Sequence, residues 1–347
     1  MPIRRSSKIL FVVGVLLIAA AAGIRFLLVP SATKLPTDLD STAQYTGTAD
    51  LLNAQALESG DIANAIARDV PVTIDRHIYV SNSTGDTAIT HDDTTLNTPS
   101  GAIPNNHTYA LDRTTLDSAP APSGEAVEDH SGLTISLPLH PAASSDYQFY
   151  DTATRTTVPV TYVDSSAVSG RDVHNYTVDA RGPLADTTVA ASLPPALPKS
   201  LLTSILPLLP ANTAAEIGGA LDTLADPVPL NYTAETAITL AADTVTGAPI
   251  DATLNQKVIA NLDLGGRTVT VMPVLAIDTE LTDASVADAA AASAKASSQL
   301  TMIGTYAPLT LLVLAAVCIV VAWIRRHPKS APVTGSRLDE DEVVPLG

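Results

Sequence analysis

Two apolar segments, one near each end of the chain, constrain the fold most strongly. Residues 9–29 are apolar apart from Arg25, and a second apolar run extends from Tyr306 to Ile324. As a helix the first segment would be roughly 31 Å long, which is enough to cross the hydrocarbon core of a bilayer. It is also longer than the apolar part of a typical signal peptide, so an uncleaved anchor is favoured over a cleaved leader. We therefore predict membrane-spanning helices at residues 9–29 and 303–324.

The basic residues beside these segments predict the sidedness of the chain. They are Arg4, Arg5 and Lys8 before the first segment, and Arg325, Arg326 and Lys329 after the second. Because basic residues flank membrane helices on the cytoplasmic side, both termini are expected in the cytoplasm of a two-pass plasma-membrane protein. Residues 1–8 are then a short cytoplasmic end and residues 31–302 form an exported domain. Residues 325–347, basic at first and then acidic, are predicted to be a disordered cytoplasmic tail.

Composition excludes several classes of function. The chain has 36 Asp and Glu but only 19 Lys and Arg, for a net charge of −17. This balance argues against a nucleic-acid partner, because binding to phosphates depends on basic residues. A single cysteine, Cys318, excludes an intramolecular disulfide and a multi-cysteine metal site. Glycine-rich phosphate-binding loops are also absent from the sequence, so we expect neither a metal nor a cofactor.

Residues between the two apolar segments predict an α+β domain built mainly on an antiparallel, barrel-like sheet with peripheral helices. Alternating segments rich in β-branched residues predict strands at 70–80, 133–139, 157–163, 173–178, 232–240, 250–262 and 267–277. Glycine-containing turns separate several of them, which favours antiparallel neighbours. Helical periodicity predicts helices at 49–70, 213–224 and 284–300, with Asn212 as the cap of the second.

Residues 193–210 differ from the rest of this acidic, threonine-rich domain. Prolines there separate large apolar side chains, which are Leu197, Leu201, Leu202, Ile205, Leu206, Leu208 and Leu209. Prolines inside the segment forbid one long helix. Two interpretations stay open: a short helical cap that buries these side chains against the sheet, or an apolar portal for a lipid-like ligand.

Catalytic motifs are not found in the sequence. It contains neither a Gly-x-Ser-x-Gly nucleophile elbow nor a His-Glu-x-x-His zinc motif. Two short runs, His91-Asp92-Asp93 and Asp129-His130-Ser131, hold suitable residue types, but adjacent side chains rarely converge on one reacting atom. We interpret both runs as exposed acidic loops, assign no catalytic residue, and predict that the protein is not an enzyme.

Three motifs and the last helix resemble one known group of proteins. The motifs are KLPTDLDST at residues 34–42, YDTATRTTVPVTYV at 150–163 and PVPLNYTAET at 227–236. They resemble the actinobacterial envelope family labelled "porin PorA family", formerly a domain of unknown function. The resemblance implies envelope assembly in bacteria with a mycolate outer layer, and a link to the maturation of lipomannan and lipoarabinomannan. Two terminal anchors around a β-rich domain are also similar, more loosely, to class B scavenger receptors, whose ectodomains carry hydrophobic tunnels.

The functional prediction is a non-enzymatic envelope-assembly protein that binds or conveys a lipid or lipoglycan intermediate. An alternative is a structural partner that scaffolds polytopic glycosyltransferases. A pore is less favoured, because strands such as residues 173–178 are too polar to face lipid. An apolar tunnel within the domain would favour lipid binding, whereas a filled core with an exposed apolar patch would favour a scaffold.

Overall fold

The computed structural model describes residues 5–326, which divide into two compact units. One unit contains residues 5–30 and 301–326 of the described chain, and the other contains residues 31–300. The predicted cytoplasmic tail lies outside the described residues from position 327 onward, as do residues 1–4.

The first unit is a pair of apolar helices. Its elements are α1 (Arg5–Gly23), η1 (Ile24–Leu28), the start of α2 (Val29–Ala32), η4 (Met302–Tyr306) and α8 (Ala307–Ile324). Small residues recur every seven positions at the buried contact: Ser7, Gly14 and Ala21 on α1, and Pro308, Ala315 and Ala322 on α8. The Ser7 hydroxyl donates a hydrogen bond of 2.7 Å to the Ala322 carbonyl, and a Cβ on Gly14 would lie only 2.8 Å from Ile319 Cγ1. Small side chains therefore allow the two helix backbones to approach closely.

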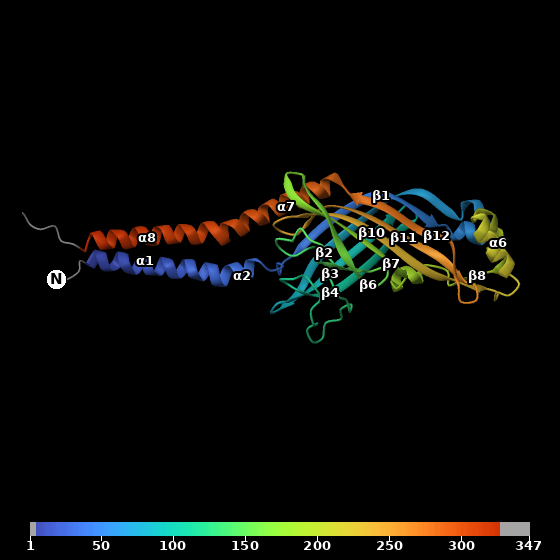
Figure 1. The fold of residues 1–347 in the computed structure, drawn as a ribbon, viewed down its shortest axis with the longest axis horizontal. Helices are drawn as coiled ribbons and strands as arrows, with labels where there is room; N and C mark the ends of the chain where they lie inside the picture. Colours follow the sequence, from blue (N-terminus) through green and yellow to red (C-terminus); the bar gives the residue numbers. More distant parts are fainter. Residues whose placement is uncertain (1–4, 327–347) are drawn as a thin grey trace, which may run out of the picture. The chain divides into compact units, whose positions relative to one another are not determined.

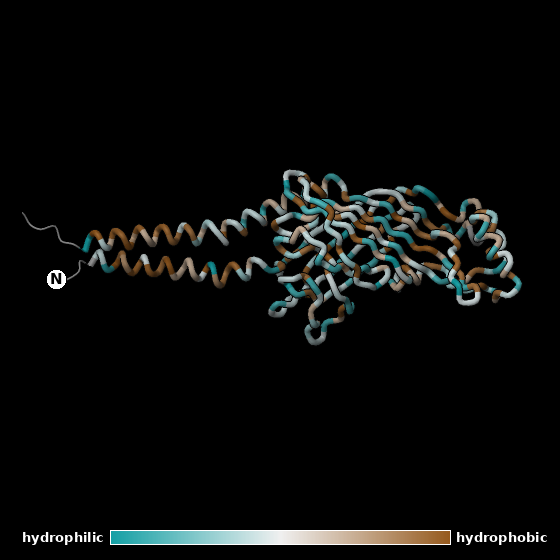
Figure 2. The backbone as a smooth tube through the Cα atoms, in the orientation of Figure 1, coloured by the Kyte–Doolittle hydropathy of each residue, from teal (hydrophilic) through white to brown (hydrophobic). Residues whose placement is uncertain are grey.

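Most residues of this helix pair are hydrophobic (Figure 2). Phe11, Leu16 and Leu312 are among its exposed large side chains. Two helices, Ser6–Ala32 and Asp283–Ile324, are long and apolar enough to cross a membrane. Exposed surface of this kind is unfavourable in water and is suited to lipid.

The second unit is built on one ten-stranded sheet. Its strands are β1 (Asp40–Leu52), β2 (Ile66–Thr84), β3 (Thr87–Thr98), β4 (Gly101–Asp112), β5 (Gln148–Asp151), β6 (Thr156–Val168), β7 (Arg171–Pro183), β10 (Asn231–Asp243), β11 (Pro249–Asp263) and β12 (Thr268–Leu281). The strand order is β4-β3-β2-β1-β12-β11-β10-β7-β6-β5, and every neighbouring pair is antiparallel. The sheet curls into a half-barrel (Figure 1). The predicted antiparallel sheet is confirmed.

An irregular segment, residues 113–147, runs between the two edge strands of the half-barrel. The Glu128 amide donates to the Thr108 carbonyl of β4 at 2.8 Å, and the Leu133 amide donates to the Gln148 carbonyl of β5 at 2.8 Å. The strand predicted at residues 133–139 is wrong, because only Leu133 makes a β-bridge there. Pro138 has no amide hydrogen to donate to a neighbouring strand.

Helices are peripheral in this unit. They are α3 (Ala54–Ser59), η2 (Ile62–Asn64), α4 (Thr187–Ala191), α5 (Lys199–Ile205), η3 (Leu206–Leu208), α6 (Ala211–Ala220) and α7 (Asp283–Thr301). A short strand pair, β8 (Ala196–Leu197) with β9 (Val228–Pro229), flanks α5 and α6. The helix predicted at 284–300 is confirmed by α7. The helix predicted at 213–224 corresponds to α6, but α6 begins earlier, and its N-cap is Pro210 rather than Asn212.

The helix predicted at residues 49–70 is wrong. Ala49 and Val70 belong to β1 and β2 and are direct partners across the two strands. Only α3 and a single 3-10 turn separate these strands, and Gly60, with a φ of +76°, follows the end of α3. The apolar residues that suggested one helical face are therefore divided among two strands, α3 and the 3-10 turn, and the backbone groups of the strands are satisfied by pairing along the sheet.

An apical core lies where α5 and α6 cover one end of the sheet (Figure 1). Leu202 and Ile205 of α5 and Ile217 of α6 are fully buried there against Val258 and Leu262 of β11. The turn between β11 and β12 contains Gly265 and Gly266, which both take positive φ values. The apical core thus fills the space at one end of the half-barrel.

Candidate functional site: a cavity inside the half-barrel

A cavity of about 1120 Å³ lies inside the half-barrel. Its walls follow the twofold alternation of strands, because every second side chain faces the inside of the sheet. On β3 the lining residues are Asp92, Thr94, Leu96 and Thr98, and on β4 they are Ile103, Asn105, His107 and Tyr109, together with Pro104, which breaks the alternation. β1, β2, β10, β11 and β12 supply further lining residues, so the cavity draws on most of the sheet.

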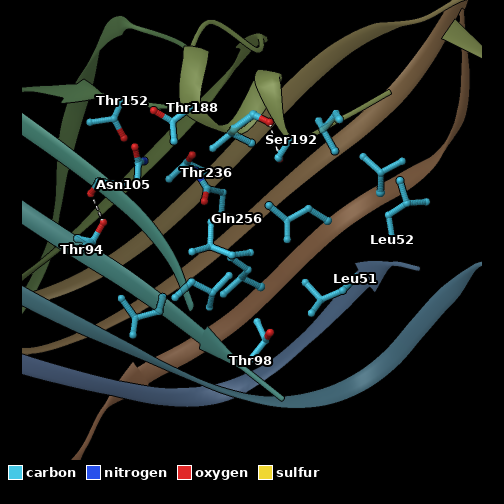
Figure 3. Close-up of a pocket in the computed structure, with 18 of the residues that line it drawn as sticks. Leu51, Leu52, Thr94, Thr98, Asn105, Thr152, Thr188, Ser192, Thr236 and Gln256 are labelled. Atoms are coloured by element: carbon cyan, nitrogen blue, oxygen red, sulfur yellow. Dashed lines mark hydrogen bonds between the residues drawn. The ribbon is translucent and has the colours of Figure 1, made fainter. Parts of the chain in front are cut away.

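One part of the wall is apolar. It is formed by Leu51, Leu52, Leu96, Leu193, Leu197, Leu201, Leu254, Val274 and Ile277, which we call the leucine wall. Figure 3 shows Leu51 and Leu52 together at one side of the cavity. These residues come from five different segments of the chain, so only the folded sheet brings them together. An apolar wall of this extent is suited to a hydrocarbon chain.

Another part of the wall is polar and uncharged. It is formed by Thr94, Asn105, Thr152, Thr188, Thr236 and Gln256, which we call the amide–hydroxyl wall. In Figure 3 these side chains lie away from Leu51 and Leu52. Thr236 of β10 and Gln256 of β11 are cross-strand partners and so stand beside each other. The cavity is therefore amphiphilic.

Several polar atoms of the lining residues have no hydrogen-bond partner within the described chain. Among buried atoms these are Thr236 Oγ1, Asn105 Oδ1, His107 Nε2, Tyr109 Oη and Thr134 Oγ1. Buried polar atoms are nearly always paired in folded proteins, and a group of exceptions beside one cavity calls for an explanation. An amphiphilic ligand or bound water would supply the missing partners.

The charged residues of the lining are paired with each other or with the backbone. Arg76 donates two hydrogen bonds to Asp92, from Nε at 2.8 Å and from an Nη atom at 2.6 Å. Burial alone would lower the pKa of Arg76, but the Asp92 carboxylate reverses this and raises the Arg76 pKa above its usual value. Asp92 was predicted to lie in an exposed loop, and that is wrong, because it is buried on the inner face of β3.

A histidine lies between two carboxylates next to the amide–hydroxyl wall. His107 Nδ1 lies 2.7 Å from Glu128 Oε2, and His107 Nε2 lies 4.0 Å from Asp186 Oδ2. The Tyr150 hydroxyl also donates to Glu128 at 2.8 Å. Burial raises the pKa of Tyr150 most, and the contact with Glu128 raises it further. The Tyr150 hydroxyl therefore keeps its proton at neutral pH and remains a hydrogen-bond donor. These residues join β4, the irregular segment, β5 and the start of α4 into one wall.

Metal binding finds no support in the part of the chain that the structure describes. Within residues 5–326, no three His, Cys, Asp or Glu side chains are arranged to hold a metal ion. The arrangement around His107 connects neighbouring elements by hydrogen bonds and presents no serine, threonine or cysteine activated by a base.

The predicted portal residues separate into three groups. Leu197 and Leu201 belong to the leucine wall and also contact the apical core, in which Leu197 is buried and against which Leu201 packs partly buried. Leu202, Ile205 and Leu209 are buried in the apical core, and Leu206 packs partly buried against the same core. Leu208 is 55% exposed and is not among the lining residues. A route for lipid past this segment stays a prediction, and Leu201 is better placed than Leu202 to test it.

Sequence reasoning missed the amide–hydroxyl wall. A signal was present in the strands correctly predicted at 232–240 and 250–262, where Thr236 and Gln256 take inward positions next to Ile238 and Leu254. Polar residues on an otherwise apolar strand face are unusual. The strands β3 and β4, which supply Thr94 and Asn105, were not predicted.

A curled antiparallel half-barrel with an amphiphilic cavity, in a chain that also has two apolar helices, defines a membrane protein with a β-rich cavity domain. The profile of the family described as "Porin PorA" matches residues 6–324, and the chain belongs to this family.

No curated protein matches the sequence. Among solved structures, a "MaoC-like dehydratase" is 10% identical, with a TM-score of 0.14 over 75% of this chain and 83% of that one. A putative MaoC domain dehydratase from Chloroflexus aurantiacus J-10-fl is 12% identical, with a TM-score of 0.13 over 78% and 80% of the two chains. TM-scores this low carry no argument.

Proposed function

We propose that the protein is a non-enzymatic cell-envelope protein whose exported domain binds or conveys a lipid or lipoglycan intermediate. The observation that carries the proposal is the amphiphilic cavity of about 1120 Å³. Protein interiors are close-packed and contain few voids larger than a water molecule. A cavity of this size with a leucine wall is poorly suited to water alone, whereas a hydrocarbon chain would bury apolar surface there.

The proposal places both apolar helices in the plasma membrane and both termini in the cytoplasm. Basic residues beside the two segments support this sidedness. In a Cys318→Ala background, a membrane-impermeant thiol reagent should label a cysteine introduced at the exposed Ala143 of the domain. It should spare a cysteine introduced at Ser336. The opposite labelling pattern would contradict the proposed topology.

A pore and a scaffold are the alternatives. A pore through this sheet is disfavoured because the half-barrel is open, with β4 and β5 at its edges, and a membrane-spanning sheet must close. Asp172, Asp179 and Arg181 are also exposed on β7, whereas lipid-facing strands are apolar. A scaffold that holds polytopic glycosyltransferases would not require a cavity.

The test is native mass spectrometry of the full chain purified in detergent. The wild-type protein should carry a co-purifying lipid, and Leu201→Asn should lose it because a polar amide would interrupt the leucine wall. Leu208→Asn is the matched control, since Leu208 is exposed and does not line the cavity. In cells, only the first variant should accumulate immature lipoglycan. A wild-type protein that carries no lipid would contradict the proposal.

A further inference from the structure

We propose that the cavity selects amphiphiles whose head group is uncharged and bears hydroxyl groups, and that Thr236 and Gln256 recognise this head group. The inference rests on the proposed lipid-binding function and specifies the class of ligand. It follows from two properties of the lining, namely which hydrogen-bonding groups are unpaired and where the charges are already neutralised.

Unpaired groups of the amide–hydroxyl wall can both donate and accept hydrogen bonds. Thr236 Oγ1 is buried without a partner in the described chain, and no hydrogen bond of that chain involves the half-buried Gln256 side chain. An amide offers a donor and an acceptor, and a hydroxyl offers both in one atom. A ligand hydroxyl complements each of them, because it too can donate and accept. An apolar ligand would leave them unpaired.

A phosphate group would find no free cation in the cavity. Arg76 is the one Lys or Arg side chain among the lining residues, and both of its hydrogen bonds go to Asp92. The lining also contains Asp151, so it holds one arginine against two aspartates. An anionic head group would therefore lose its hydration and gain no counter-charge.

The start of α4 is also unavailable to an anion. α4 begins at the cavity, where Thr188 and Val189 are lining residues. The Asp186 side chain already accepts from the amides of Thr188, at 2.8 Å, and Val189, at 3.2 Å. This carboxylate occupies the helix end at which a phosphate would otherwise find donors.

The position of the two walls sets the direction of the ligand. Thr236 stands beside Gln256 on adjacent strands. Figure 3 shows both among the other side chains of the amide–hydroxyl wall, with Leu52 at the other side of the cavity. A head group at these two residues leaves the leucine wall for the hydrocarbon chain. Thr236 and Gln256 thus act as specificity residues, and the leucine wall supplies the apolar contact area.

The experiment compares two lipids that differ only in a phosphate group. Full-length protein in phosphatidylcholine nanodiscs is incubated with equal amounts of 1-monooleoylglycerol and 1-oleoyl-lysophosphatidic acid. Retained lipid is counted by mass spectrometry after subtraction of empty nanodiscs. We expect the protein to retain roughly tenfold more monooleoylglycerol than lysophosphatidic acid. The two lipids share the same chain and glycerol, so this difference would report on the phosphate group alone.

Variants then test the two specificity residues. Thr236→Val with Gln256→Leu should reduce retained monooleoylglycerol about tenfold while an apolar probe, 1-octadecene, is retained as before. Thr239→Val is the matched control, because Thr239 lies on the same strand but is exposed on the opposite face. If the double variant fails to fold, Thr236→Val alone provides the same comparison.

The outcomes separate this inference from the function on which it rests. If neither lipid is retained by the wild-type protein, the proposed lipid-binding function fails. If lysophosphatidic acid is retained as well as or better than monooleoylglycerol, lipid binding stands and the selection of an uncharged head group is overturned. If the double variant retains both lipids like the wild-type protein, Thr236 and Gln256 are not the specificity residues.

Discussion

Two groups of buried polar residues in the same domain differ in how their hydrogen bonds are satisfied. Asp243 is completely buried at the end of β10 and accepts from Arg171 Nε at 2.8 Å and from the amides of Val245 and Thr246. In the amide–hydroxyl wall, by contrast, Asn105 Oδ1 and Thr236 Oγ1 have no partner in the described chain. A satisfied group of this kind stabilises the fold, whereas an unsatisfied group beside a cavity is available to water or to the proposed ligand.

The contacts of Asp243 explain why that group is structural. Arg171 also donates to the Ser297 hydroxyl of α7 at 2.7 Å, and Thr246 lies within 2.6 Å of the Ser293 hydroxyl on the same helix. The Asp243 cluster therefore joins α7 to the ends of β7 and β10. Every bond in it connects elements of the folded domain, and none faces the cavity.

The largest expected effect is that of Asp243→Asn. Removing one partner of a buried ion pair leaves the Arg171 charge uncompensated, which should lower the free energy of unfolding by about 3–5 kcal/mol. Denaturant unfolding of the full chain in detergent, followed by circular dichroism, measures this loss. Asp179→Asn is the control on β7: it is exposed and should change stability by less than about 0.5 kcal/mol. If the two variants are equally stable, the Asp243 cluster stabilises the fold no more than an exposed surface residue does.

A second effect separates the apical core from the cavity. Leu202 and Leu201 are neighbours in α5, but Leu202 is fully buried in the apical core, whereas Leu201 packs partly buried against that core and also lines the cavity. Leu202→Ala should cost about 2–5 kcal/mol of unfolding free energy, and Leu201→Ala clearly less, because the space beside Leu201 is already open. The same unfolding measurement compares them. If Leu201→Ala proves the more destabilising, the wall is packed core and the cavity interpretation is weakened.

These two leucines also illustrate how far sequence could lead. The five long strands from Thr156 onward were predicted nearly in place, because alternation and glycine turns are local signals, whereas the short strands β8 and β9 were not predicted. Periodicity cannot tell whether the surface opposite an apolar side chain is filled or empty, so Leu201 and Leu202 received the same interpretation. The helix predicted at residues 49–70 was wrong because the pairing of β1 with β12 joins residues that are far apart in the sequence. A local pattern of apolar residues does not reveal such a contact.

The amide–hydroxyl wall was harder still to predict. Asn105 and Thr236 come together only because the sheet curls, and nothing local distinguishes them from the many other polar residues of the domain. Asp92 was misplaced in an exposed loop because its partner, Arg76, lies on a neighbouring strand and the ion pair forms only after pairing. Charged residues are rarely buried without such a partner, and sequence alone does not reveal it.

A third effect concerns how the stability of the fold depends on pH. Burial raises the pKa of Asp243, but the Arg171 hydrogen bond and the bonds from Thr246 and Val245 outweigh it, and the net pKa lies below the usual value. A carboxyl with a lowered folded-state pKa contributes stability above its unfolded-state pKa of about 3.9, and this contribution is lost as the pH falls through the folded-state value. Stability of the wild-type protein should therefore fall more steeply below about pH 4 than that of Asp243→Asn. Parallel acid profiles of the two proteins would contradict this assignment.

The smallest expected effect lies in the amide–hydroxyl wall and completes the comparison. Thr236→Val replaces an unpaired buried hydroxyl with a methyl group of the same shape, so the ligand-free protein should keep its stability or gain slightly. Thr154 provides the matched control, because its buried hydroxyl donates to Asp151 at 2.6 Å. Thr154→Val should lower the unfolding free energy by about 1–3 kcal/mol, since an acceptor loses its donor. Denaturant unfolding of lipid-stripped protein measures both changes. If Thr236→Val is as damaging as Thr154→Val, the Thr236 hydroxyl already has a partner in the folded domain, and the contrast between satisfied and unsatisfied groups does not hold there.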